Sequence, residues 1–152
     1  MSQIKKIQEK LNVFRISRLK SYYNDRSSGL RVLVVDDEKI NQLFMLGHLK
    51  KLGITADFAN NGAEALAMVS GIHFDVVFMD VEMPVMDGIE ATRQIQSIHP
   101  NPPLIIGYTT LQGSHNEKIC LEAGMSRIIH KKISFHEIES LIVSIYKKLL
   151  NA

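Results

Sequence analysis

The sequence predicts an α/β fold in which a parallel five-stranded sheet is covered by helices on both faces. Two observations carry this prediction. Short apolar segments typical of strands alternate along the chain with longer segments whose apolar residues recur every three or four positions, as they do in helices. Three of the strand segments are apolar without interruption, as expected for strands buried on both faces. Such alternation indicates a parallel sheet, because each helix returns the chain to the edge where the next strand begins.

The first half of the predicted domain contains two strands and two helices. RVLVVDD (31–37) is a short apolar run that ends on acids, and ITADFA (54–59) alternates apolar and polar residues like a half-exposed strand. Between them, KINQLFMLGHLKKLG (39–53) has helical spacing, with apolar residues at 40, 43, 44, 46, 49 and 52. NNGAEALAMVSG (60–71) follows as an alanine-rich helix with a capping residue at its start and a glycine at its end.

The second half continues with three strands and three helices. DVVFMD (75–80) and LIIGY (104–108) are continuously apolar, and SRIIHK (126–131) is short. If the alternating strand and the short strand lie at the edges, the strand order is 2-1-3-4-5, which is the flavodoxin-like (βα)5 doubly wound arrangement. The helices that separate and follow these strands are predicted at 88–99, 114–124 and 134–150.

Composition limits the class of protein. The chain has 152 residues, of which 45% are hydrophobic and 22% charged, as in a globular domain and unlike a disordered chain. No apolar run approaches the roughly 18 residues of a membrane span, and we expect no secretory signal. Because Cys120 is the single cysteine, no intrachain disulfide is possible, and a reducing, cytoplasmic location is expected.

Charge divides the chain into two parts. Residues 1–29 contain seven Lys or Arg and two acids, a balance of +5, whereas residues 30–152 contain 11 basic and 14 acidic residues, a balance of −3. We therefore expect a basic N-terminal helical arm with a linker at 1–29 and one domain at 30–152. Residues of the arm recur three and four positions apart, at Ile4, Ile7, Leu11, Phe14 and Arg18.

This spacing leaves more than one function open for the arm. Because so short a helix is marginal alone, we interpret it first as a helix that docks on the domain or forms a homodimer. A basic helix on a membrane surface is the second interpretation. Nucleic-acid binding is not expected, because no recognition motif accompanies the basic residues.

Polar side chains stand at the ends of four predicted strands. The first strand ends in Asp36 and Asp37, the third ends in Asp80, Thr109 follows the fourth, and Lys131 ends the fifth. These side chains should converge, because the carboxyl ends of parallel strands lie at one rim of the sheet. Three carboxylates without nearby Cys or His suit Mg²⁺, and a lysine and a hydroxyl beside them suit a tetrahedral oxyanion. An aspartate in this setting can act as a nucleophile and form an aspartyl-phosphate.

Several motifs resemble the receiver domain of two-component response regulators, over about residues 30–150. VLVVDDEKINQ resembles the acidic-pair segment of that family, and DVVFMDVEMPVMDG resembles its phosphoacceptor strand and the following loop. NNGAEAL also resembles its counterpart. The spacings from Asp37 to Asp80, from Asp80 to Thr109 and from Asp80 to Lys131 are 43, 29 and 51 residues, close to the usual separations in the family.

The resemblance implies a phosphoacceptor domain for signalling and not an enzyme, with self-catalysed phosphotransfer and autodephosphorylation only. Asp80 would accept a phosphoryl group from a phosphohistidine on a histidine kinase or a histidine phosphotransfer protein. Lys131 would contact a phosphoryl oxygen, and the Thr109 hydroxyl would move toward it and so switch contacts with a downstream protein. The residues implied to hold Mg²⁺ are Asp37, Asp80, the backbone carbonyl of Glu82 and, through water, Asp36.

The sequence departs from the pattern of the family at two positions. Lys132 stands where proline usually follows the lysine, and Ile128 stands where a Tyr or Phe usually reports the threonine movement. A receiver-like interaction module that is not phosphorylated is therefore the alternative hypothesis. A flavodoxin is disfavoured because the acids at 36–38 would repel a cofactor phosphate. A haloacid-type phosphohydrolase is disfavoured because Glu82 stands where its second aspartate is normal.

Overall fold

The computed structural model describes residues 2–4, 6–7, 10, 16–18 and 29–151. Five parallel strands form one sheet in the order β2-β1-β3-β4-β5, so the predicted order and both predicted edge strands are confirmed. The strands are β1 (Val32–Val35), β2 (Ala56–Ala59), β3 (Val76–Asp80), β4 (Leu104–Thr109) and β5 (Arg127–His130). The helices are α2 (Lys39–Lys51), α3 (Gly62–Gly71), α4 (Gly88–Ile98), α5 (Ser114–Ala123) and α6 (Phe135–Leu150).

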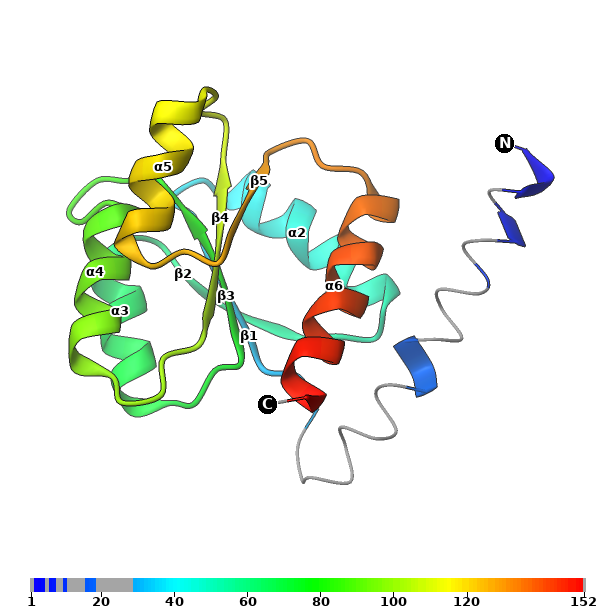
Figure 1. Cartoon of the computed structure of the whole chain (residues 1–152), viewed down its shortest axis with the longest axis horizontal. Helices are drawn as coiled ribbons and strands as arrows, with labels where there is room; N and C mark the ends of the chain where they lie inside the picture. Colours follow the sequence, from blue (N-terminus) through cyan, green and yellow to red (C-terminus); the bar gives the residue numbers. More distant parts are fainter. Residues whose placement is uncertain (1, 5, 8–9, 11–15, 19–28, 152) are drawn as a thin grey trace.

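Helices cover both faces of the sheet, with α2 and α6 on one face and α3, α4 and α5 on the other (Figure 1). Each face has its own hydrophobic core. The α2/α6 core includes Val34, Met45, Leu49, Phe78, Ile106, Tyr108, Ile138, Ile142 and Tyr146. The α3–α5 core includes Leu33, Ala65, Val77, Met79, Ala91, Ile95, Ile105, Cys120 and Met125. The predicted doubly wound arrangement, with helices on both faces of one parallel sheet, is therefore confirmed.

Alternation along the strands decides which face each side chain at the rim occupies. Phe78 belongs to the α2/α6 core and Met79 to the α3–α5 core, so Asp80 points to the α2/α6 side. The backbone of Asp80 is in register with Tyr108, which lies on the same face because register partners point the same way. Thr109, the next residue of β4, points to the opposite face.

Helix α2 forms where it was predicted, but part of the predicted apolar set faces outward. Ile40, Leu43 and Phe44 are 71%, 52% and 44% exposed, whereas Gln42 is buried. Gln42 Nε2 donates to the Asp36 backbone carbonyl at 2.6 Å and to Asn60 Oδ1 at 3.0 Å, which explains how an amide can occupy the inner face. Helix α2 is therefore tied to the strand ends by polar contacts and leaves apolar side chains at the surface.

The N-terminal arm is described only in part. Ile4 and Ile7 are 79% and 56% exposed, whereas Ile16 is 2% exposed and belongs to the α2/α6 core. Leu11 and Phe14 of the predicted repeat lie outside the described residues. The burial of Ile16 favours docking of the arm on the domain, while homodimerisation and the boundary at residues 29 and 30 stay predictions. No helix in the described part of the chain is long and apolar enough to cross a membrane.

Candidate functional site

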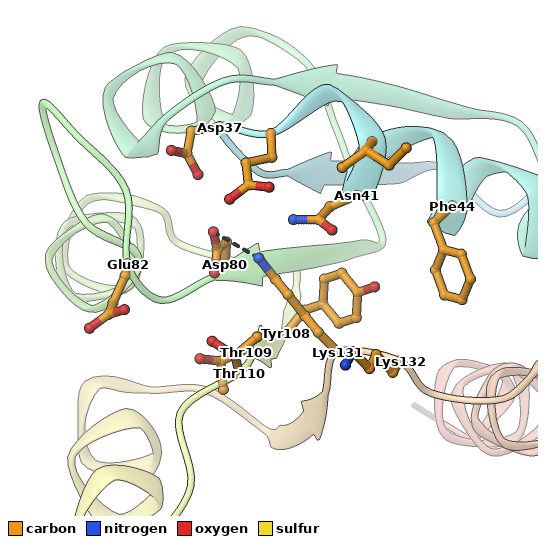
Figure 2. A pocket seen from close by; sticks show the side chains of 12 residues that line it. Asp37, Asn41, Phe44, Asp80, Glu82, Tyr108, Thr109, Thr110, Lys131 and Lys132 are labelled. Carbon is orange, nitrogen blue, oxygen red and sulfur yellow. Dashed lines mark ion pairs between the residues drawn. The ribbon is translucent and has the colours of Figure 1, made fainter.

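The carboxyl ends of β1, β3, β4 and β5 surround a cavity of about 360 Å³ at one rim of the sheet (Figure 2). Asp37, Asp80 and Glu82 line it, and Lys131 reaches into the middle. Thr109 lines the same cavity. Topology explains this convergence, because all five strands run in one direction and end at the same rim.

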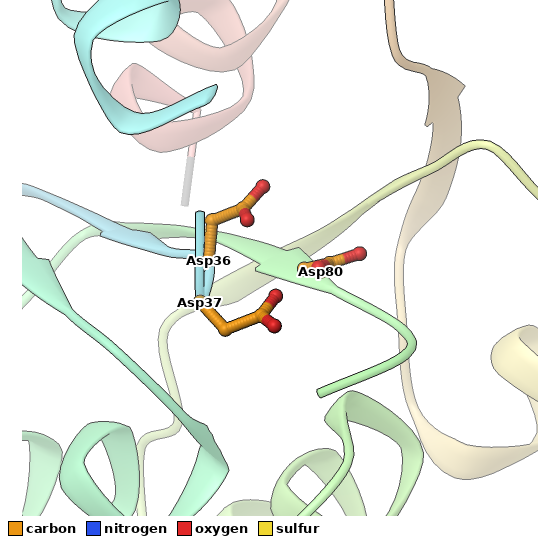
Figure 3. A group of neighbouring side chains, drawn as sticks. All are labelled: Asp36, Asp37 and Asp80. Atoms are coloured by element: carbon orange, nitrogen blue, oxygen red, sulfur yellow. The ribbon is translucent and has the colours of Figure 1, made fainter. Parts of the chain in front are cut away.

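Three carboxylates form the acidic side of the site (Figure 3). Asp36, Asp37 and Asp80 each offer an oxygen atom that lies within 4.8 Å of those of the other two. Asp36 is 0% exposed and Asp80 is 4% exposed, whereas Asp37 is exposed. Asp36 Oδ1 accepts hydrogen bonds from the Glu38 backbone N–H at 2.9 Å and from Asn41 Nδ2 at 3.3 Å, so its orientation is fixed by the turn that begins α2.

Lys131 supplies the positive charge opposite these carboxylates. Its Nζ lies 2.8 Å from Asp36 Oδ2 and 3.2 Å from Asp80 Oδ2. Burial alone would lower the pKa of Lys131, but its hydrogen bonds and ion pairs with the two aspartates outweigh burial and raise the pKa above its usual range. The lysine is therefore protonated and held within the site.

Lys131 reaches the carboxylates although the usual proline does not follow it. Lys132 has a positive φ of 70°, a conformation that a residue with a side chain rarely adopts. The chain therefore turns at Lys132 in the left-handed region, and Lys131 still points at Asp36 and Asp80.

Burial destabilises the ionised form of the Asp80 carboxyl group. Burial raises the pKa of Asp80 to about 6; the Lys131 charge opposes this rise and the Asp36 charge adds to it. A cation among the three carboxylates would relieve both the burial cost and the mutual repulsion. Because the donors are hard oxygens, the residues present fit Mg²⁺.

The Thr109 side chain points to the opposite face of the sheet from Asp80, but at the rim it lines the same cavity. It is 3% exposed, and its Oγ1 accepts a hydrogen bond from the Leu111 backbone N–H at 3.0 Å. On the same face Ile128 and Met125 fill the space above Gly107, where an added Cβ would lie 2.8 Å from Ile128 Cδ1 and from Met125 Sδ. Ile128, which stands where the family usually has Tyr or Phe, therefore packs against Gly107 on the Thr109 face.

The structure brings together the six site residues predicted from the sequence. Asp36, Asp37, Asp80 and Lys131 form the charged cluster, and Thr109 and Glu82 line the same cavity. Their roles in binding metal and phosphate remain predictions.

Sequence reasoning missed two further residues of this site. Asn41 donates to Asp36, and the ring of Tyr108 lies with its centroid 5.6 Å from Lys131 Nζ. Tyr108 could have been found from the pattern, because it precedes Thr109 by one position and must therefore point to the face that holds Asp80.

Comparison with known families places most of the chain in one of them. The response regulator receiver domain matches residues 32–143. Two-component response regulator 24 of Arabidopsis thaliana is 34% identical over 120 residues, which cover 78% of this chain and 86% of that protein. Hybrid signal transduction histidine kinase K of Dictyostelium discoideum is 33% identical over 121 residues, or 74% of this chain. The match spans only 10% of that kinase, so this chain corresponds to a small part of such proteins.

Solved structures give the same result. The receiver domain of Ssk1 from Saccharomyces cerevisiae, in complex with the histidine phosphotransfer protein Ypd1, is 26% identical with a TM-score of 0.71, covering 78% of this chain and 89% of that one. The receiver domain of sensor histidine kinase PA1611 from Pseudomonas aeruginosa, with a magnesium ion in its active-site cleft, is 26% identical with a TM-score of 0.72. That match covers 79% of this chain and 99% of the other.

Proposed function

This chain belongs to the response regulator receiver domain family, and we propose that Asp80 accepts a phosphoryl group from a phosphohistidine on a partner protein. The observation that carries this proposal is the position of Lys131, whose Nζ lies 2.8 Å from Asp36 and 3.2 Å from Asp80 at a rim with a third carboxylate. The Lys131 ammonium can neutralise the charge of a phosphoryl oxygen next to the attacking carboxylate.

The proposed transfer needs no general base. An oxygen of ionised Asp80 forms a bond to phosphorus while the phosphorus–nitrogen bond of the phosphohistidine breaks, and the imidazole, which carries a proton on its other ring nitrogen, leaves as a neutral group with the electron pair. Lys131 stabilises the negative charge on the phosphoryl oxygens, and the Thr109 hydroxyl can donate to one of them. Asp37, Asp80 and the carbonyl of Glu82 would hold Mg²⁺, with Asp36 contributing through water, and the ion would neutralise charge on the phosphoryl group.

The exposed side of α2 supports a protein as the phosphodonor. Ile40, Leu43 and Phe44 are 71%, 52% and 44% exposed, and Ile40 and Phe44 also line the cavity that contains Asp80. Apolar side chains of this kind beside a reactive carboxylate suit the surface of a partner that must place its histidine over Asp80. The Ssk1 receiver, which is similar to this chain, is seen in complex with a histidine phosphotransfer protein.

Phosphorylation would act as a switch through added charge. A phosphoryl group adds roughly −1.5 to −2 units of charge at the rim, which can bias a two-state surface toward one conformation. We propose a cytoplasmic signalling role in which this bias changes contact with a downstream protein. Homodimerisation through the N-terminal arm is a separate proposal, and the molar mass of the full chain in solution tests it.

The test of this function is incorporation of labelled phosphate. With Mg²⁺ and a phosphorylated histidine phosphotransfer protein, the wild-type chain should acquire an acid-stable, hydroxylamine-labile phosphate. Asp80→Asn should reduce labelling at least 100-fold, because the nucleophile is lost. Asp87→Asn is the matched control, since Asp87 lies in the same segment but caps α4 by accepting from the Glu90 backbone N–H at 2.8 Å. Equal labelling of wild type and Asp80→Asn would falsify the proposal.

The second candidate is a receiver-like module that is not phosphorylated. The observation in its favour is that Lys131 already pairs with Asp36 and Asp80, so the cluster is partly neutralised without a metal ion. In that case neither Mg²⁺ nor acetyl phosphate would change the spectrum of the protein or its affinity for a partner.

A further inference from the structure

Tyr108 lies beside the charged cluster although the proposed chemistry assigns it no task. Its ring centroid is 5.6 Å from Lys131 Nζ, within the roughly 6 Å over which an aromatic face attracts a cation. We propose that Tyr108 is a positioning residue, whose ring holds the Lys131 ammonium in the place where it meets the phosphoryl group. This inference rests on the proposed function and assigns the control of Lys131 to a residue outside the ion-pair network.

Sheet register fixes the ring where it can do this. Tyr108 of β4 pairs with Asp80 of β3 on one side and with Ile129 of β5 on the other. The three side chains share one face of the sheet, and Lys131, directly after β5, points to the same face, where it pairs with Asp80. In Figure 2 the ring of Tyr108 lies alongside the Lys131 side chain, on the side away from Glu82.

Burial makes the ring a rigid support. Tyr108 is 1% exposed and belongs to the α2/α6 core together with Phe78 and Ile106. Turning it away from Lys131 would leave a void in a close-packed layer, which is costly. The ring therefore keeps its place when a cation or a phosphoryl group binds in the cavity.

The other partners of Lys131 are two carboxylates that would also interact with a bound cation. Asp36 and Asp80 hold the ammonium at 2.8 and 3.2 Å, and these carboxylates also form the cation cluster with Asp37. A cation that draws on their oxygens weakens their hold on Lys131. The aromatic face attracts the ammonium without using a carboxylate, so it still orients Lys131 when the carboxylates are engaged.

The test compares two substitutions of Tyr108 by titration with beryllofluoride, a phosphoryl mimic, at saturating Mg²⁺. Tyr108→Leu removes the aromatic face, and we expect the affinity to fall about 2- to 30-fold, the change that corresponds to a cation–π contact of about 0.5–2 kcal/mol. Tyr108→Phe keeps the face and should bind within about 2-fold of wild type. Tyr146→Leu is the matched control, since Tyr146 lies in the same core but does not line the cavity.

Three results of this titration would overturn the inference: equal affinity of wild type and Tyr108→Leu, equal losses in Tyr108→Phe and Tyr108→Leu, or an equal loss in Tyr146→Leu. A wild-type chain that binds no beryllofluoride would instead overturn the proposed function. The two failures are therefore distinguishable.

A measurement on the wild-type chain keeps the inference testable if Tyr108→Leu does not fold. The ε-methylene protons of Lys131 should resonate upfield of those of exposed lysines, because they lie near the face of an aromatic ring. We expect this shift to persist after Mg²⁺ and beryllofluoride are added. A Lys131 signal that moves to the position of exposed lysines on ligand binding would overturn the inference.

Discussion

The α2/α6 core and the α3–α5 core pack opposite faces of one sheet with different kinds of side chain. The first contains large aromatic residues, among them Phe78, Tyr108 and Tyr146, and its rim holds the buried ion pairs of Lys131. The second has one buried aromatic residue, Phe74, among aliphatic, alanine and methionine side chains, and its rim holds Thr109 beside Gly107.

This difference separates two physical requirements. Charged groups at a reactive site must be held in place, and rigid aromatic packing with a satisfied ion-pair network does this. The proposed movement of the Thr109 hydroxyl needs neighbours that can repack, and methionines such as Met79 and Met125 adapt their shape more easily than branched or aromatic residues. We call the α2/α6 side of the rim, which holds Asp80 and Lys131, the chemical face, and the opposite side the Thr109 face. The chemical face should be rigid, and the Thr109 face should be able to repack.

Loss of the ammonium should have the largest effect. Lys131→Met removes two charge-assisted contacts on the chemical face, and we expect beryllofluoride affinity in Mg²⁺ to fall roughly 10- to 100-fold. Isothermal titration calorimetry measures the change. Lys132→Met, at the neighbouring exposed lysine, should cost less than about 3-fold. Similar losses in the two variants would show that general positive charge at the rim matters and the position of Lys131 does not.

The metal-free chemical face should lose stability as pH rises. Burial raises the pKa of Asp80 from its usual 3.8 to about 6, so between these values the unfolded chain releases the proton first and folding becomes less favourable. Asp80→Asn removes this penalty. In EDTA we expect the variant to be roughly 2 kcal/mol more stable than wild type at about pH 8 and equal to it below about pH 4.

Urea unfolding across this pH range measures the difference. Added Mg²⁺ is the control, because it should stabilise wild type at about pH 8 more than it stabilises Asp80→Asn. A difference in stability that does not change with pH would contradict the assignment to the Asp80 carboxyl.

A methyl group added on the Thr109 face should be tolerated at moderate cost. In Gly107→Ala the new Cβ would lie 2.8 Å from the ends of the Met125 and Ile128 side chains, which can move. We expect a loss of about 1–2 kcal/mol in the free energy of unfolding, with beryllofluoride affinity within about 2-fold of wild type. Gly71→Ala is the control, since a Cβ there meets no atom within 4 Å.

The loop that presents Lys131 should show the smallest effect. Lys132 has a φ of 70°, which glycine adopts without steric cost, so Lys132→Gly should stabilise the protein by about 0.5 kcal/mol. Thermal unfolding measures this, and Lys118→Gly in the interior of α5 should instead destabilise by about 1 kcal/mol. A loss of stability in Lys132→Gly would show that the lysine side chain contributes more than its backbone conformation costs.

Most of the fold and the charged site could be predicted because they depend on local patterns and on one topological rule. Buried strands read as continuous apolar runs, and parallel strands must end at one rim, so Asp36, Asp80 and Lys131 could be brought together from their positions alone. The face of α2 could not be predicted in this way. Its apolar residues surround much of the helix, and the packing of Met45 and Leu49 left Ile40 and Phe44 outside.

The sequence by itself determined the element order, the strand order, and the group of acids, hydroxyl and lysine at the rim, because hydrophobic periodicity and strand direction are properties of the chain. Tertiary structure alone decided that Lys131 pairs directly with Asp36 as well as Asp80, that Gln42 occupies the inner face of α2, and that the ring of Tyr108 lies against the ammonium. These contacts join residues far apart in sequence, and their distances depend on how the sheet and α2 pack together. That packing cannot be predicted from a local pattern in the sequence.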